Sequence, residues 1–109
     1  MKDHRIFDAE RAAAAEHSLY EALLSLETPD ECQRFLADLC TPAEVEAMVD
    51  RWAVVPLLDQ GLPYRKIHDL TGVSVTTIGR VARYLSAGNG GYELALQRLH
   101  GRTTRDTLQ

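Results

Sequence analysis

The sequence has little of what metal sites, secreted proteins and membrane proteins require. Its two cysteines, Cys32 and Cys40, form no CxxC pair and no paired His–Cys spacing, so neither a zinc site nor a disulfide framework is indicated. No apolar run approaches the roughly 18–20 residues that cross a bilayer. The amino terminus also lacks the apolar core of a signal peptide. We therefore expect a cytoplasmic protein, without membrane contact, in which both cysteines are buried thiols.

The chain also lacks a catalytic constellation. Its four histidines are scattered and form no HExxH pattern. No nucleophile elbow surrounds Ser74 or Ser86, and the glycine-rich segment 88–91 lacks the strand–loop–helix context of a phosphate-binding loop. We expect that the protein is not an enzyme and that it has no cofactor and no metal.

What the chain does contain is typical of a small, soluble, all-α domain. It has 109 residues, of which 45% are hydrophobic, 26% charged and 6% aromatic. A core of this size leaves little stability in reserve, so burial against a second subunit is expected. No segment shows the alternation of a strand, and apolar residues recur at helical spacing throughout.

The first half of the sequence predicts three helices. The first covers about 8–26, with an apolar stripe of Leu19, Leu23 and Leu26. A capping box, Thr28-Pro29-Asp30-Glu31, begins the second. The same arrangement, Thr41-Pro42-Ala43-Glu44, begins a third that runs to Gly61. Pro56 kinks or splits this helix, and one bent helix is the favoured interpretation.

Three shorter helices should follow, over 63–71, 75–87 and 92–100, and no apolar periodicity continues after Gly101. The sequence thus predicts one domain over residues 1–109. It has a helical part for dimerisation at about 8–60, a helix-turn-helix at 63–87, a C-terminal helix at 92–100 and a frayed tail at 101–109.

Charge is divided unevenly along the chain. The total is −4, which does not suggest a DNA-binding protein. Residues 1–50, however, carry four basic and twelve acidic side chains, for a net charge of −8. Residues 51–85 carry five basic and two acidic side chains, for +3, and the remainder is +1. The region available for phosphate attraction is therefore basic, and the local charge decides this rather than the total.

The segment 64–85 has the residue order of a helix-turn-helix. Ile67 and Leu70 can face inward from its first helix, and Gly72 suits a tight turn with positive φ. Val73 can fill the junction, and Ser74 can cap the second helix. The inward stripe of that second helix comprises Ile78, Val81, Ala82 and Leu85.

The remaining side chains of this segment form a polar and basic surface. The outward positions of the second helix are Thr76, Thr77, Gly79, Arg80 and Arg83, and those of the first are Arg65, Lys66 and His68. Small residues allow close approach to base edges, while Arg80 can reach a guanine or a phosphate. The cations of the first helix would contact the DNA backbone. The alternative is a pair of packed helices with a solvated polar face.

Together with this segment, several stretches resemble the bacterial Trp repressor superfamily, and within it the YerC/YecD-type, Trp repressor-related branch. They are Leu19 to Leu26, Phe35 to Thr41, the second capping box, Arg51, Gly61, and Gly88 to Glu93. The resemblance implies a Trp repressor-like intertwined helical homodimer that binds a palindromic operator in duplex DNA through successive major grooves. It implies that the N-terminal helices form the dimer interface. Its base-facing positions would be Val75, Thr76, Thr77, Gly79 and Arg80.

The resemblance also implies a possible effector site at Thr41, Arg51 and Arg80, where the Trp repressor holds tryptophan. Val81 stands where that protein has glycine, and Tyr84 where it has serine, so added volume should close the indole slot. We therefore expect a DNA-binding regulator, a repressor, that does not respond to tryptophan. Two alternatives stay open: a protein-interaction module of the same fold that does not read DNA, and a repressor gated by a small amino-acid-like ligand near Arg51 and Arg80.

Overall fold

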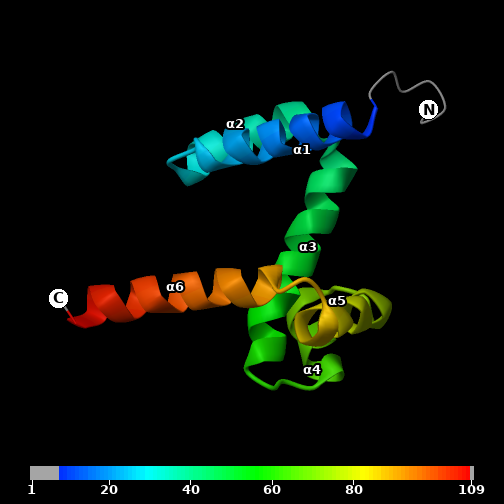
Figure 1. The fold of residues 1–109 in the computed structure, drawn as a ribbon. Helices are drawn as coiled ribbons and strands as arrows, with labels where there is room; N and C mark the ends of the chain where they lie inside the picture. Colours follow the sequence, from blue (N-terminus) through cyan, green and yellow to red (C-terminus); the bar gives the residue numbers. More distant parts are fainter. Residues whose placement is uncertain (1–7, 109) are drawn as a thin grey trace. The chain divides into compact units, whose positions relative to one another are not determined.

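The computed structural model describes residues 8–108, with side chains up to Gly101. Within this range the chain is all-α, with six helices, as the sequence predicts (Figure 1). They are α1 (Ala9–Leu24), α2 (Pro29–Leu39), α3 (Pro42–Asp59), α4 (Tyr64–Thr71), α5 (Val75–Ala87) and α6 (Gly91–Leu108). The chain divides into two compact units, Met1–Pro42 and Ala43–Gln109. None of the helices in residues 8–108 has the length and apolarity needed to cross a membrane.

Side-chain caps set the ends of the first unit's helices. Asp8 accepts a hydrogen bond from the Arg11 amide at 2.9 Å at the start of α1. Thr28 Oγ1 accepts from the Glu31 amide at 3.1 Å at the start of α2. The return bond of the predicted capping box is displaced by one residue, because Glu31 Oε1 accepts from the amide of Glu27 and not from that of Thr28. The chain reverses direction between these two helices (Figure 1).

The first unit buries no residue within the part of it that the structure describes. Four large hydrophobic side chains of α1 and α2 are exposed, namely those of Tyr20, Leu23, Leu24 and Leu39. Cys32 and Cys40 are free but only half-buried, so the expectation of two buried thiols is wrong. Both cysteines lie in the first unit, in which none of residues 8–42 is buried.

The second unit contains the hydrophobic core. Its buried residues are Val54, Val55, Ile67, Val73, Ile78, Val81 and Leu96, which come from α3, α4, the α4–α5 turn, α5 and α6. Trp52, Leu85 and Tyr92 are among the partly buried side chains around them. Full burial of an aliphatic side chain is worth about 1.5–3 kcal/mol relative to exposure. The core therefore fixes α4 and α5 against their neighbours.

The structure shows how far α3 and α6 continue, which the sequence left open for α3 and predicted differently for α6. α3 runs unbroken through Pro56, so the favoured single helix is confirmed over the split one. α6 begins at Gly91 and its backbone remains helical to Leu108, whereas the sequence predicted an end at His100. Gly101 weakens a helix by about 1 kcal/mol relative to alanine but does not remove a hydrogen bond, so it does not end α6.

Candidate nucleic-acid interface

A network of hydrogen bonds fixes the turn between α4 and α5. Gly72 adopts φ +77° and donates its amide hydrogen to the His68 carbonyl at 2.8 Å. Thr71 Oγ1 donates to the Ile67 carbonyl at 2.7 Å and accepts from the Val73 amide at 3.0 Å. With Val73 buried beneath it, the turn is held from both sides. The predicted roles of Gly72 and Val73 are confirmed.

His68 is part of this turn. Its Nδ1 lies 2.8 Å from the Val73 carbonyl oxygen. Because a carbonyl can only accept, Nδ1 must carry the hydrogen, and this bond orients the imidazole. The histidine residue itself remains exposed. The sequence analysis gave His68 only as an outward residue near the DNA backbone, and the structure adds a role in joining α4 to the turn.

Ser74 caps α5, as predicted. Its Oγ accepts from the Thr77 amide at 3.1 Å and lies 3.1 Å from Thr77 Oγ1 as a donor. The Thr77 hydroxyl is therefore half-buried and engaged in the cap, while Thr76 beside it is exposed. Of the first turn of α5, Thr76 and the 53% exposed Val75 are the most accessible side chains.

The exposed face of the two helices agrees with the sequence at most positions. Arg65, Lys66, His68, Arg80 and Arg83 are all exposed, whereas Ile67, Ile78 and Val81 are buried. Leu70 was expected to face inward but is 58% exposed. Thr71 is half-buried instead, so the inward face of this two-turn helix continues at the fourth residue after Ile67, not the third.

Gly79 and Tyr64 are neighbours across the two helices. A Cβ added to Gly79 would lie 3.9 Å from Tyr64 Cε2, which is ordinary van der Waals contact. The sequence placed Gly79 on the outward face, but it is half-buried against α4. Tyr64, which was not predicted as a site residue, is 42% exposed and lines a groove of about 510 Å³ with Arg65, His68, Asp69 and Val75. No local pattern signals this contact, because it depends on how the helices pack.

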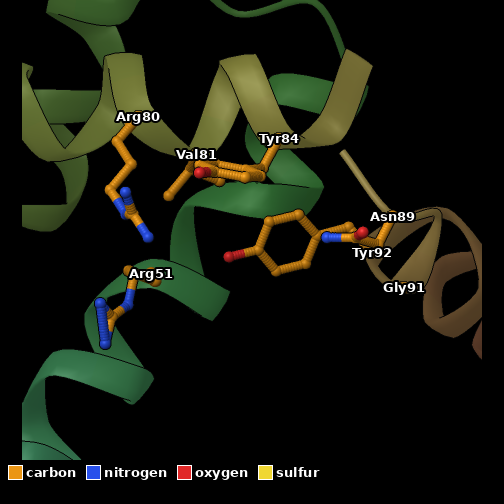
Figure 2. A pocket seen from close by; sticks show the side chains of 7 residues that line it. All are labelled: Arg51, Arg80, Val81, Tyr84, Asn89, Gly91 and Tyr92. Carbon is orange, nitrogen blue, oxygen red and sulfur yellow. The ribbon is translucent and has the colours of Figure 1, made fainter. Parts of the chain in front are cut away.

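A second cavity, of about 430 Å³, lies behind α5. Its lining residues are Arg51, Arg80, Val81, Tyr84, Asn89, Gly91 and Tyr92, contributed by α3, α5, α6 and the α5–α6 connection (Figure 2). Arg51 and Arg80 therefore line one cavity, as expected, and space remains despite Val81 and Tyr84. Figure 2 shows the hydroxyl ends of Tyr84 and Tyr92 pointing toward the side where the two arginines lie. Thr41, the third expected effector residue, belongs to the first unit.

Two aromatic residues that line this cavity, Tyr84 and Tyr92, contact neighbouring side chains through their rings. The Arg80 guanidinium carbon lies 4.8 Å from the centroid of the Tyr84 ring, and that of Arg83 lies 5.7 Å from it. Tyr92 contacts Trp52 with centroids 6.4 Å apart. The sequence analysis singled out Tyr84 only as added bulk and did not anticipate its two arginine contacts.

Three comparisons relate this arrangement to known proteins. The Trp repressor protein family matches residues 15–100, which is most of the chain. The uncharacterized protein YerC of Bacillus subtilis (strain 168) is 44% identical over 81 residues, which are 74% of this chain and 78% of YerC.

Two solved structures are similar in fold, each with a TM-score of 0.76 over 80% of this chain. One is a TrpR-like protein from Eubacterium eligens ATCC 27750, 38% identical and covered over 90% of its length. The other is a candidate Trp repressor from Staphylococcus aureus, 39% identical and covered over 87% of its length.

Proposed function

The chain belongs to the Trp repressor family, a family of non-enzymatic regulators, and from this premise we propose that it is a sequence-specific DNA-binding transcriptional regulator. We propose further that it is a repressor and that it acts as a homodimer on a palindromic operator. In this proposal α5 enters the major groove and α4 lies across the phosphate backbone.

The observation that carries the proposal is the exposed surface of α5. This helix contains two arginines and no carboxylate, and its N-terminal turn presents Val75 and Thr76 to solvent. A threonine offers a hydroxyl and a methyl group to base edges, and a helix N-terminus favours negative charge. The rigid core beneath holds this surface in one shape, so that it can be matched to one DNA sequence.

The proposed roles divide along the same surface. Val75, Thr76 and Arg80, which are exposed, are the proposed base-facing residues, whereas half-buried Thr77 and Gly79 of the same predicted set would act indirectly. Arg65, Lys66, His68 and Arg83 are the proposed phosphate contacts, which fix register rather than sequence. Gly79 lies against Tyr64 of α4, where an added Cβ would make ordinary van der Waals contact, and Thr77 is proposed to orient the first turn through the Ser74 cap.

Dimerisation is supported by the composition of the first unit. Its described residues include none that is buried, yet Tyr20, Leu23, Leu24 and Leu39 expose large apolar side chains. Exposed large apolar side chains without a hydrophobic core beneath them are typical of a surface that a partner covers. A second copy of the chain would cover it and would place two α5 helices on one operator.

Salt dependence and charge removal test DNA binding. Affinity for duplex DNA should fall steeply as salt rises, because phosphate contacts release counterions. Arg80→Ala should cost about 1–3 kcal/mol and relax sequence choice, whereas Arg65→Ala or Lys66→Ala should weaken binding to all sequences alike. Arg98→Ala on α6 is the control that removes the same charge outside α4 and α5. Binding that is indifferent to salt, or equal in Arg80→Ala and Arg98→Ala, would favour a protein-interaction module instead.

A second candidate, a regulator gated by a small amino-acid-like ligand, is favoured by the cavity between Arg51 and Arg80. Its two guanidinium groups suit a carboxylate, and its two phenol rings suit an apolar side chain. Tryptophan itself is not the proposed ligand, because Val81 and Tyr84 add side-chain volume where the Trp repressor has glycine and serine, although they do not close the cavity. Calorimetry with a panel of amino acids tests this candidate, and a flat response throughout the panel removes it.

A further inference from the structure

Tyr84 is the side chain that holds the two arginines of α5. It lies one helical turn after Arg80 and directly after Arg83, and its ring is within 6 Å of both guanidinium carbons, at 4.8 Å and 5.7 Å. Residues four apart share a helix face, so the closer contact follows from the sequence spacing. Tyr84 is 40% exposed. It therefore does not serve mainly to fill the core, which Val81 and Ile78 already do.

The type of partner matters for what the arginines can still bind. A carboxylate would hold a guanidinium by occupying its N–H groups and cancelling its charge. An aromatic ring attracts the cation through its face and occupies none of the in-plane donors. Because α5 contains no carboxylate, the ring restrains Arg80 while the charge and the N–H groups stay available.

We propose that Tyr84 is a positioning residue for DNA binding: its ring preorganises Arg80, and more weakly Arg83, before the DNA arrives. This inference rests on the proposed function and assigns Tyr84 a role in DNA binding that acts through the two arginines. A restrained arginine loses less freedom when it binds, so the ring contributes to affinity without touching DNA.

The experiment measures duplex affinity in four variants of the full chain, one of which is Arg80→Gln alone as the reference for the double variant. Tyr84→Leu removes the ring but keeps an apolar side chain, Tyr84→Phe keeps the ring without the hydroxyl, and Tyr84→Leu is repeated in an Arg80→Gln background. The probe is a fluorescent duplex of about 40 base pairs that the wild-type protein enriches from a pool of random sequences, long enough for two half-sites separated by a helical turn. Fluorescence anisotropy gives the dissociation constant, and circular dichroism gives the melting temperature of each variant.

The expected results separate positioning from folding. Tyr84→Leu should weaken binding about three- to tenfold, since exposed cation–π contacts are modest and two are lost. Tyr84→Phe should recover most of that loss. In the Arg80→Gln background the same leucine substitution should cost less than twofold, because only the longer contact to Arg83 remains to be lost. Melting temperatures should agree closely among the tyrosine variants.

Several outcomes would overturn the inference. They are an unchanged affinity in Tyr84→Leu, an equal loss in Tyr84→Phe and Tyr84→Leu, and a full loss from Tyr84→Leu when Arg80 is already glutamine. A wild-type protein that enriches no duplex from the pool would overturn the proposed function and this inference with it. Wild-type binding with an unaffected Tyr84→Leu would overturn only the role of Tyr84.

Discussion

The two units of the chain differ in how they are stabilised. In the second unit, seven hydrophobic residues from α3, α4, the α4–α5 turn, α5 and α6 are buried around one core. In the first, residues 8–42 include no buried side chain, although α1 and α2 are well capped and present exposed leucines. Charge also differs between the units: residues 1–42 carry four basic and nine acidic side chains, for a net charge of −5, whereas residues 43–109 carry eight basic and seven acidic side chains, for +1. The second unit thus has its own hydrophobic core beneath the basic surface of α4 and α5, whereas the described part of the first unit has none, which is why we propose that it is covered by a second copy of the chain.

The largest effect should come from the core of the second unit. Ile78→Ala removes a fully buried side chain and should lower the free energy of unfolding by about 2–5 kcal/mol, because a cavity remains beneath α5. Leu70→Ala, on the exposed face of α4, is the control and should change it by less than about 0.5 kcal/mol. Denaturant titration followed by circular dichroism measures both. Similar losses in the two variants would mean that the core assignment is wrong.

The next largest effect should be on dimerisation, after substitution of exposed leucines in the first unit. Replacing both Leu23 and Leu24 with aspartate should raise the dimer dissociation constant at least about tenfold, because burying one leucine is worth about 1.5–3 kcal/mol. Sedimentation equilibrium measures the change, and Leu70→Asp, which introduces the same side chain at an exposed leucine of the second unit, should leave the mass as in the wild type. A wild-type protein that is monomeric at micromolar concentration would refute the dimer.

The turn of the second unit offers a smaller and more local test. Gly72→Ala places a side chain at φ +77° and should cost about 1–2 kcal/mol, although an added Cβ meets nothing within 4 Å. The cost is conformational rather than steric. Gly91→Ala is the control, because Gly91 lacks a positive φ and its Cβ is also unobstructed. Thermal melts that show equal effects would contradict the assignment of strain to Gly72.

The smallest effect should come from removing one helix cap in each unit. Ser74→Ala and Thr28→Ala each remove a capping hydrogen bond of about 3.1 Å. Each substitution should lower the stability of its own helix start by about 1 kcal/mol. Only Ser74→Ala should also weaken duplex binding, because only that cap orients the first turn of α5. Hydrogen exchange at the two helix starts measures the loss of each cap. Equal weakening of duplex binding by both variants would remove the distinction between the units.

Local chemistry explains why much of the fold could be predicted from the sequence. Thr28, Gly72 and Ser74 act within a few residues of their own positions, so the helix boundaries next to them were predicted closely. The continuation of α6 was missed because Gly101 is only a weak stop. The orientation of Leu70 was missed because a two-turn helix carries too few residues for its periodicity to define one face.

In the candidate site, too, features set by nearby residues could be predicted, whereas features set by the packing of separate helices could not. The exposed arginines and Thr76 were predicted from helical spacing, whereas the contact of Arg80 with Tyr84 was missed although their spacing of four residues would have been sufficient to predict it. The contact of Tyr64 with Gly79 was not predictable, because it joins two helices across a turn. Likewise, the remaining volume beside Val81 depends on α3 and α6 and not on α5 alone.

Selection from random duplexes tests the central claim most directly, namely that a dimer reads DNA through the exposed face of α5. Wild-type protein should enrich a palindromic sequence whose half-sites are one helical turn or a multiple of it apart. Arg80→Ala should lose or relax that sequence, and Arg98→Ala should retain it. Enrichment of no sequence, or of the same sequence by Arg80→Ala with unchanged affinity, would contradict the assignment of α5 as the reading helix.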